Sequence, residues 1–144
     1  MTQLQAIRKF ADYVAQSHVT LYRSPDDDWE INLSGTKPRM GIPTHLMKID
    51  RGDREYRAYF IEHCPMGRGF AHVTISILHE IGHHFNREIF LFDTDMKEYE
   101  ELRGFDHFNC PCERVATEWA FEWLKDAEHR KVAKQFEREF FSHA

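Results

Sequence analysis

The pentad His79-Glu80-Ile81-Gly82-His83 is the part of this chain best suited to chemistry. Two histidines four residues apart lie on the same side of a helix, where both imidazoles can bind one metal ion. The Glu80 carboxylate lies between them along the chain and can accept a proton from a water molecule that the ion activates. The spacing therefore predicts a zinc site with His79 and His83 as ligands and Glu80 as the general base.

A catalytic zinc ion usually has three protein ligands and one open position, so a third ligand must come from elsewhere. The extended metzincin pattern would place glycine at position 86 and histidine at position 89. The chain has Asn86 and Ile89 there, so that pattern fails. The other common arrangement takes a glutamate from a later helix, and two candidates, Glu113 and Glu118, lie close together.

Helical geometry separates these two glutamates. At about 100° per residue, the apolar side chains of residues 115–127 share one broad face of a helix. Glu113 falls at the edge of this face, nearly in line with Ala120, whereas Glu118 falls on the opposite, polar face. Ala116 and Ala120 leave room for a neighbouring helix to approach closely. We therefore expect Glu113 to be the third zinc ligand; the alternative is a first-turn glutamate that only complements the helix dipole.

Several other residues are zinc ligand types and leave two alternatives open. His107, Cys110 and Cys112 precede the same helix and could supply the third ligand instead of Glu113. His63 and Cys64 precede the earlier helix, and with Cys110 and Cys112 they could hold a second, structural zinc ion. The competing interpretation is that the cysteines are buried or free thiols.

Helices must carry the ligands, and apolar periodicity predicts where these helices lie. A helix over residues 70–86 would carry both histidines, and a helical region over 111–141, with a break near 126–129, would carry the glutamate. A first helix is expected over 2–17, with Thr2 as its N-cap. The apolar residues that predict the histidine-bearing helix recur at helical spacing; they are Phe70, Val73, Ile77, Ile81 and Phe85.

The segment between the first two predicted helices favours strands. Residues 29–33 could form a short strand, and residues 34–43 are rich in glycine and proline and predict a loop. Two strands are expected over 44–50 and 54–62, joined at Asp50-Arg51-Gly52-Asp53, a hairpin signal. The predicted order is a helix, a small antiparallel sheet, the metal-binding helix and C-terminal helices, which is an α+β fold class.

Composition limits the class of protein. A chain of 144 residues, with 42% hydrophobic and 14% aromatic residues, predicts one globular domain over 1–144. The net charge of −5 and the lack of a basic stripe give no reason to expect nucleic acid as a partner. No apolar run has the length of a membrane span. The first ten residues lack the apolar core of a signal peptide, and the three cysteines are an odd number, so we expect a cytoplasmic protein.

With these residues in view, the chain resembles the ImmA/IrrE group of small zincin metallopeptidases, which are minimal gluzincins. That group combines an H-E-x-G-H helix with a later E-x-x-A segment that carries an aromatic residue three positions on. The resemblance covers residues 70–127. The group usually has an arginine shortly before its first histidine, whereas Arg68 lies much further upstream here, so a minimal gluzincin outside the group stays an alternative. The matching residues are His79-Glu80-Ile81-Gly82-His83, Glu113, Ala116 and Trp119.

The resemblance implies a zincin-like fold, a bound Zn²⁺ ion, a cytosolic setting and proteolysis of a protein target. We therefore expect a zinc-dependent metallopeptidase that hydrolyses peptide bonds in a peptide or protein substrate. One alternative keeps the metal without the catalysis: a zinc-stabilised protein-interaction module. Another is a metal-free helical binding protein. The sequence does not identify the residue that would stabilise the oxyanion. The candidates that it contains are Tyr56, Tyr59, Tyr99 and His107.

Overall fold

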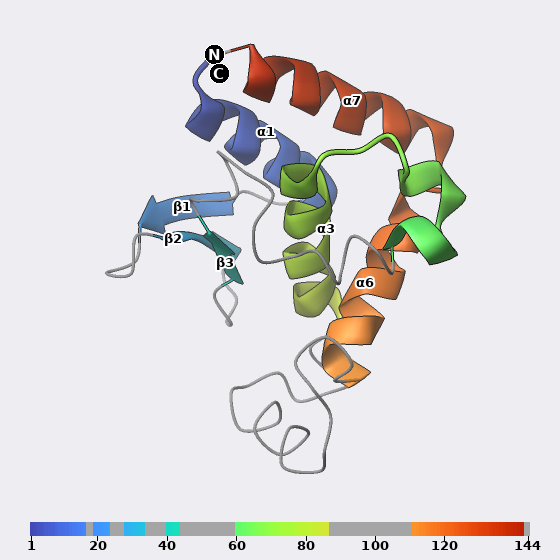
Figure 1. Cartoon of the computed structure of the whole chain (residues 1–144). Helices are drawn as coiled ribbons and strands as arrows, with labels where there is room; N and C mark the ends of the chain where they lie inside the picture. The colour runs from blue at the N-terminus through green and yellow to red at the C-terminus, as the bar shows by residue number, and fades with distance from the viewer. Residues whose placement is uncertain (17–18, 24–27, 34–39, 44–59, 87–110, 143–144) are drawn as a thin grey trace.

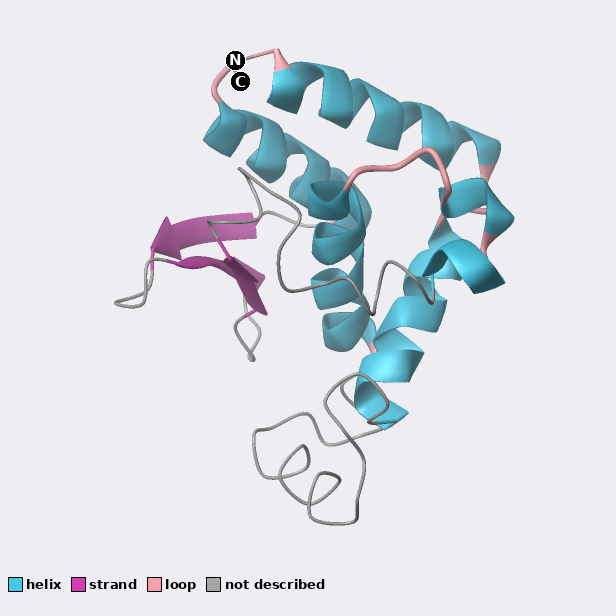
Figure 2. Cartoon of the chain, viewed as in Figure 1, coloured by secondary structure: helices cyan, strands magenta, loops and turns pink. Residues whose placement is uncertain are grey.

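The computed structural model describes residues 1–16, 19–23, 28–33, 40–43, 60–86 and 111–142. Helices make up most of this part of the chain (Figure 2). They are α1 (Gln3–Ala15), the short 3₁₀ helix η2 (Pro65–Gly67), α3 (His72–Phe85), α6 (Pro111–Trp123) and α7 (Ala127–Phe141). None of the helices in the described ranges has both the length and the apolar character needed to cross a membrane.

The helices form two packed pairs. The N-terminal α1 and the C-terminal α7 lie side by side and run in opposite directions, so the two chain ends meet (Figure 1). Below them, α3 and α6 also pack side by side in opposite directions. Because α3 contacts α1, α6, α7 and β3, it is the central helix of the described structure.

Side-chain caps define where α1 and α7 begin. The Thr2 hydroxyl accepts a hydrogen bond from the Gln5 backbone N–H, and the Gln5 side chain accepts one from the Thr2 backbone, which completes a capping box. At α7, the Asp126 carboxylate accepts hydrogen bonds from the backbone N–H groups of Glu128 and His129. The predicted Thr2 cap and the predicted break near 126–129 are therefore both confirmed.

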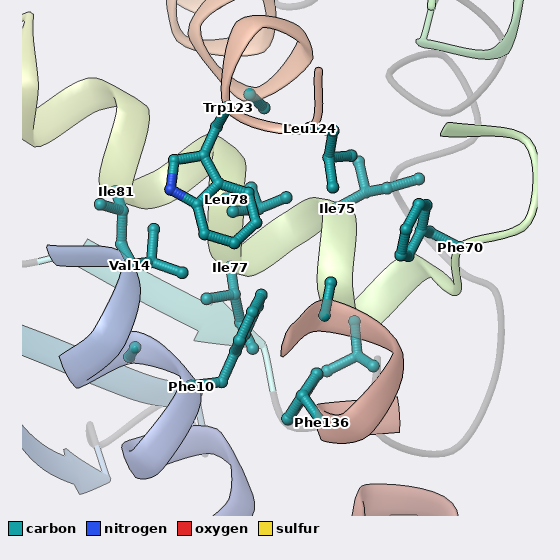
Figure 3. Packing of buried hydrophobic residues seen from close by; sticks show 14 of the residues in the cluster. Phe10, Val14, Phe70, Ile75, Ile77, Leu78, Ile81, Trp123, Leu124 and Phe136 are labelled. Atoms are coloured by element: carbon teal, nitrogen blue, oxygen red, sulfur yellow. The ribbon is translucent and has the colours of Figure 1, made fainter. Parts of the chain in front are cut away.

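The core lies where these helices meet (Figure 3). Phe10 of α1 stacks on Phe136 of α7, with ring centroids 4.6 Å apart, and meets Trp123 at the end of α6 edge to face at 5.8 Å. Burial of such large rings is the main favourable term in folding. Ile77 and Leu78 of α3 are also fully buried in this cluster, so packing fixes the helix that carries the histidines.

Two polar contacts attach the first turn of α3 to α7. The Glu137 carboxylate accepts hydrogen bonds from the Ala71 backbone N–H at 2.7 Å and from the Thr74 hydroxyl at 2.5 Å. One turn earlier on α7, the Lys134 ammonium lies 4.4 Å from the centre of the Phe70 ring. A carboxylate at the positive end of a helix dipole is favourable, so Glu137 acts as an N-terminal cap supplied by a distant helix.

A small antiparallel sheet lies beside α3 and α1. Its strands are β1 (Val19–Arg23), β2 (Asp28–Leu33) and β3 (Met40–Pro43), in the order β1-β2-β3. Leu21 pairs with Ile31 across the first two strands, and Glu30 pairs with Gly41 across the second two. The predicted strand over 29–33 is thus confirmed, but the expected loop over 34–43 is wrong in its last four residues.

The predicted hairpin is wrong where the structure describes it. Residues 60–62, the end of the strand expected over 54–62, are helical together with His63, and the Cys64 N–H donates to the Phe60 carbonyl oxygen at 2.7 Å. Phe60 and Cys64 are both buried while Glu62 between them is exposed, so this segment follows the helical period rather than the period of two that its alternation suggested. Residues 44–59, which include the expected strand over 44–50, lie outside the described part.

The expected α+β fold class is therefore corrected. The buried core residues that the structure describes lie in helices, in the segment 60–70 that leads into α3 or, for Leu124, in the turn directly after α6. The described chain is a mainly helical assembly, with three short strands at one side (Figure 2). The sequence pattern misled because alternation in a stretch as short as 54–62 does not separate a strand from a helix.

Candidate metal centre

Two helices bring together two imidazoles and one carboxylate. His79 and His83 project from successive turns of α3, and Glu113 projects from the first turn of α6. One carboxylate oxygen, Oε2 of Glu113, lies 2.8 Å from Nε2 of His79 and 3.1 Å from Nε2 of His83. Because α3 and α6 run in opposite directions, residues 34 and 30 positions apart in the chain meet across one helix interface.

The three side chains are buried. His79, His83 and Glu113 have relative exposures of 4%, 6% and 6%. The rings of His79 and His83 are 4.6 Å apart and nearly perpendicular, so their nitrogens point to the same place without stacking. A charged carboxylate is costly to bury unless cationic or hydrogen-bonding groups surround it, and here two imidazoles do so.

The same contacts decide the charge of Glu113. Burial by itself would raise the pKa of its carboxyl group, but hydrogen bonds with His79 and His83, together with the charge of those rings, outweigh burial and hold the pKa well below its usual range. Glu113 is therefore a carboxylate, which is the form that binds a metal ion.

Thr117 is a member of this cluster that sequence reasoning missed. Its Oγ1 lies 2.9 Å from Nδ1 of His79, and its hydroxyl donates to the Glu113 carbonyl oxygen at 3.0 Å. The residue is 1% exposed. One signal was available in the sequence, because Thr117 follows Glu113 by four residues and must lie on the same face of the helix.

The predicted general base, Glu80, differs from the three ligand residues in its exposure. Glu80 is on α3 between the two histidines and is half-buried, whereas the histidines are fully buried. Its position in the chain turns it by about 100° from His79 around the helix axis. The ligand atoms that converge belong to His79, His83 and Glu113, so Glu80 is not one of the groups that meet there.

The remaining candidates separate into described and undescribed residues. Glu118 is exposed, as helical phasing predicts, so it does not join the cluster. His107 and Cys110 lie outside the described residues, and so does the side chain of Cys112. The possible second zinc site therefore stays a prediction; of its members, Cys64 is a buried free thiol.

The donor set fits a metal ion. The ligand atoms of His79, His83 and Glu113 all lie within 4.8 Å of one another, which is the separation expected for groups that share one ion. Imidazole nitrogens with a carboxylate oxygen suit several divalent transition metals. The structure thus has a buried His-His-Glu group that could hold a metal ion. Among the described residues, it is the group of three or more His, Cys, Asp or Glu side chains whose ligand atoms lie this close together.

No family model matches the chain, and neither a curated protein nor a solved structure matches it.

Proposed function

We propose that this protein is a zinc-dependent metallopeptidase. His79, His83 and Glu113 would hold the ion, and Glu80 would be the general base. The observation that carries the proposal is the convergence of the three buried ligand atoms within 4.8 Å, from two helices, with a half-buried carboxylate next to one of them in the chain.

Zinc is the metal we propose, because of the ligand types. Two histidines and one glutamate form one of the usual three-ligand sets of catalytic zinc sites, which keep a fourth position open. Structural zinc sites are more often closed by four ligands that are rich in cysteine. The chemistry supplied by a bound zinc ion is Lewis-acid activation of water and of a substrate carbonyl.

The protein groups then have separate tasks. His79, His83 and Glu113 fix the position of the ion, because buried side chains on packed helices have little freedom to move. Glu80 accepts a proton from the attacking water and returns it to the amine that leaves. The half-buried location of Glu80 suits this role, since a proton carrier must reach both the centre and the substrate. A peptide or protein substrate in the cytoplasm, as the family resemblance implies, belongs to the same proposal.

Glu80→Gln tests the proposal. The purified protein is assayed for zinc by elemental analysis and for cleavage of a mixed peptide library by mass spectrometry. We expect one zinc ion per chain in both proteins, and cleavage that is about 10²–10⁴-fold slower in Glu80→Gln, because a general base contributes that much. Glu118→Gln is the matched control: it removes an exposed carboxylate of α6 and should cleave at the wild-type rate.

A zinc-stabilised interaction module is the second candidate. The burial of all three ligands, which join α3 to α6, favours it, because such a centre can act as a crosslink alone. If zinc is bound at one per chain, no peptide is cleaved and zinc removal unfolds the protein, this second candidate replaces the first. If no zinc binds even after reconstitution, both candidates are wrong.

A further inference from the structure

We propose that Thr117 is a positioning residue of the metal centre, one that selects which nitrogen of His79 faces the ion. This inference rests on the proposed function, because Thr117 can position a ligand only if His79 binds a metal ion. The hydrogen bonds that support it lie within the chain. Thr117 touches His79 with its side chain and Glu113 through the main chain, so it connects two of the three ligand residues.

The hydroxyl position is set by the helix itself. A threonine within a helix commonly donates its hydroxyl to the carbonyl oxygen four residues earlier. For Thr117 that oxygen belongs to Glu113, at 3.0 Å. Since the branched threonine side chain has few rotamers in a helix, Oγ1 is held in one position, about one turn after the glutamate ligand.

The direction of the hydrogen bond between Thr117 and Glu113 determines the direction of the hydrogen bond between Thr117 and His79. A carbonyl oxygen can only accept, so the single hydroxyl proton of Thr117 is directed to Glu113. Towards His79, 2.9 Å away, Oγ1 can then only accept, and Nδ1 of the ring must donate. The other nitrogen, Nε2, lies 2.8 Å from Oε2 of Glu113. A carboxylate oxygen can only accept, so without an ion Nε2 also donates, and a metal ion would take the place of that proton.

This arrangement has a consequence for metal binding. A histidine ligand binds through a nitrogen that carries no proton, and the hydrogen bond of its other nitrogen fixes both the tautomer and the ring orientation. With Nδ1 donating to Thr117, Nε2 is the ligand atom, and the ring is held in the plane that directs Nε2 at Glu113. Groups of this kind typically contribute about 10–100-fold to metal affinity.

Three variants test the inference. Thr117→Val has nearly the same shape and removes the acceptor, so we expect zinc affinity, measured by competition with a chelator, to fall about 10–100-fold. Thr117→Ser keeps the hydroxyl and should recover most of that loss. Thr74→Val is the control: it removes another fully buried hydroxyl, which donates to Glu137 at the far end of α3, and should leave zinc affinity unchanged.

A second readout does not need the metal. In the metal-free protein, ¹⁵N NMR of the histidine rings should show a proton on Nδ1 of His79 that exchanges slowly with solvent. Thr117→Val should lose this protection, and Thr117→Ser should retain it. A ring that carries no proton on Nδ1, or protection that is the same in wild type and Thr117→Val, would overturn the inference. If the wild type binds no zinc, the proposed function is refuted. The NMR result does not depend on zinc, so it tests the role of Thr117 separately.

Discussion

Gly82 lies directly against the backbone of Ala116. A Cβ atom at position 82 would be 2.6 Å from the Ala116 carbonyl oxygen, which is closer than nonbonded atoms approach, and 3.2 Å from the Ala116 Cα. Glycine is therefore needed here because of space, and this contact lets α3 and α6 approach closely enough for His83, the next residue, to reach Glu113 at 3.1 Å.

Gly82→Ala tests this close approach. Within a helix, alanine is favoured over glycine by about 1 kcal/mol, so an unhindered site would gain stability. Overpacking typically costs about 1–3 kcal/mol, and here the obstacle is backbone that cannot rotate away. We expect a lower free energy of unfolding in denaturant titrations and weaker zinc binding, because the helices must separate.

Gly69→Ala is the control for that experiment. A Cβ atom at position 69 would meet only the end of the Lys134 side chain, at 3.1 Å, and that flexible end can move. We expect a change in unfolding free energy within about 0.5 kcal/mol. Equal effects of the two substitutions would show that the contact with Ala116 does not limit the helix spacing.

The three ligand residues should each be required for metal binding. His79→Ala, His83→Ala and Glu113→Gln are expected to reduce zinc, measured by elemental analysis, well below one per chain. Glu113→Gln is the sharpest of these, because it preserves shape and removes only the charge.

Added zinc should raise the melting temperature of the wild type and not of Glu113→Gln, since a ligand that binds only the native state stabilises it. Glu118→Gln should behave as the wild type; loss of zinc in that variant would mean that the ligand assignment on α6 is wrong.

Glu137 should contribute to stability at the opposite end of α3. Glu137→Gln weakens the two hydrogen bonds that the carboxylate accepts from Ala71 and Thr74, and hydrogen bonds to a charged group are worth more than neutral ones. We expect a loss of about 1–2 kcal/mol in the free energy of unfolding, with faster amide hydrogen exchange in the first turn of α3. Glu122→Gln removes the exposed ion pair with Lys125 and should have little effect.

The cap of α7 should make stability depend on pH. The pKa of the Asp126 carboxyl is below its usual value of 3.8, mainly because the His129 backbone N–H donates to the carboxylate, with a second hydrogen bond from Glu128. A lowered pKa in the folded state adds stability that is present above the unfolded-state pKa and is lost as pH falls through the folded-state pKa. The midpoint of urea unfolding should therefore be higher in the wild type than in Asp126→Ala at neutral pH, and the difference should shrink below about pH 3.8. Asp126→Asn keeps a good capping residue but has no carboxyl group that titrates. The difference in urea midpoint between Asp126→Asn and Asp126→Ala should therefore not change with pH.

The helices were predictable because their signals are local. The Thr2 cap, the apolar period through Ile77 and Ile81, and the break before α7 each depend on residues within a few turns of one another. The same period placed Glu113 on the inner face of α6 and Glu118 on the outer face, as the structure has them. Three of the four residues in the cluster could thus be found from spacing alone.

The strands were less predictable because they depend on pairing between segments. β3 contains Gly41 and ends at Pro43, residue types that usually indicate a loop. In the described sheet β3 is an outer strand, and an outer strand tolerates proline. Conversely, the alternation that suggested a strand up to residue 62 gave way to helix at 60–63, where burial of Phe60 against Phe121, with ring centroids 4.7 Å apart, decides the conformation.

The sequence by itself determined which residues share a helix face: the pair His79 and His83, and the pair Glu113 and Thr117. This follows because 3.6 residues per turn is a property of the backbone. Only the tertiary structure decided that the two faces meet and that Thr117 contacts His79, because these depend on how closely α3 and α6 pack. That distance is set by the absence of a side chain at Gly82, and a contact of this kind is defined by the surface of another helix rather than by any pattern along the chain.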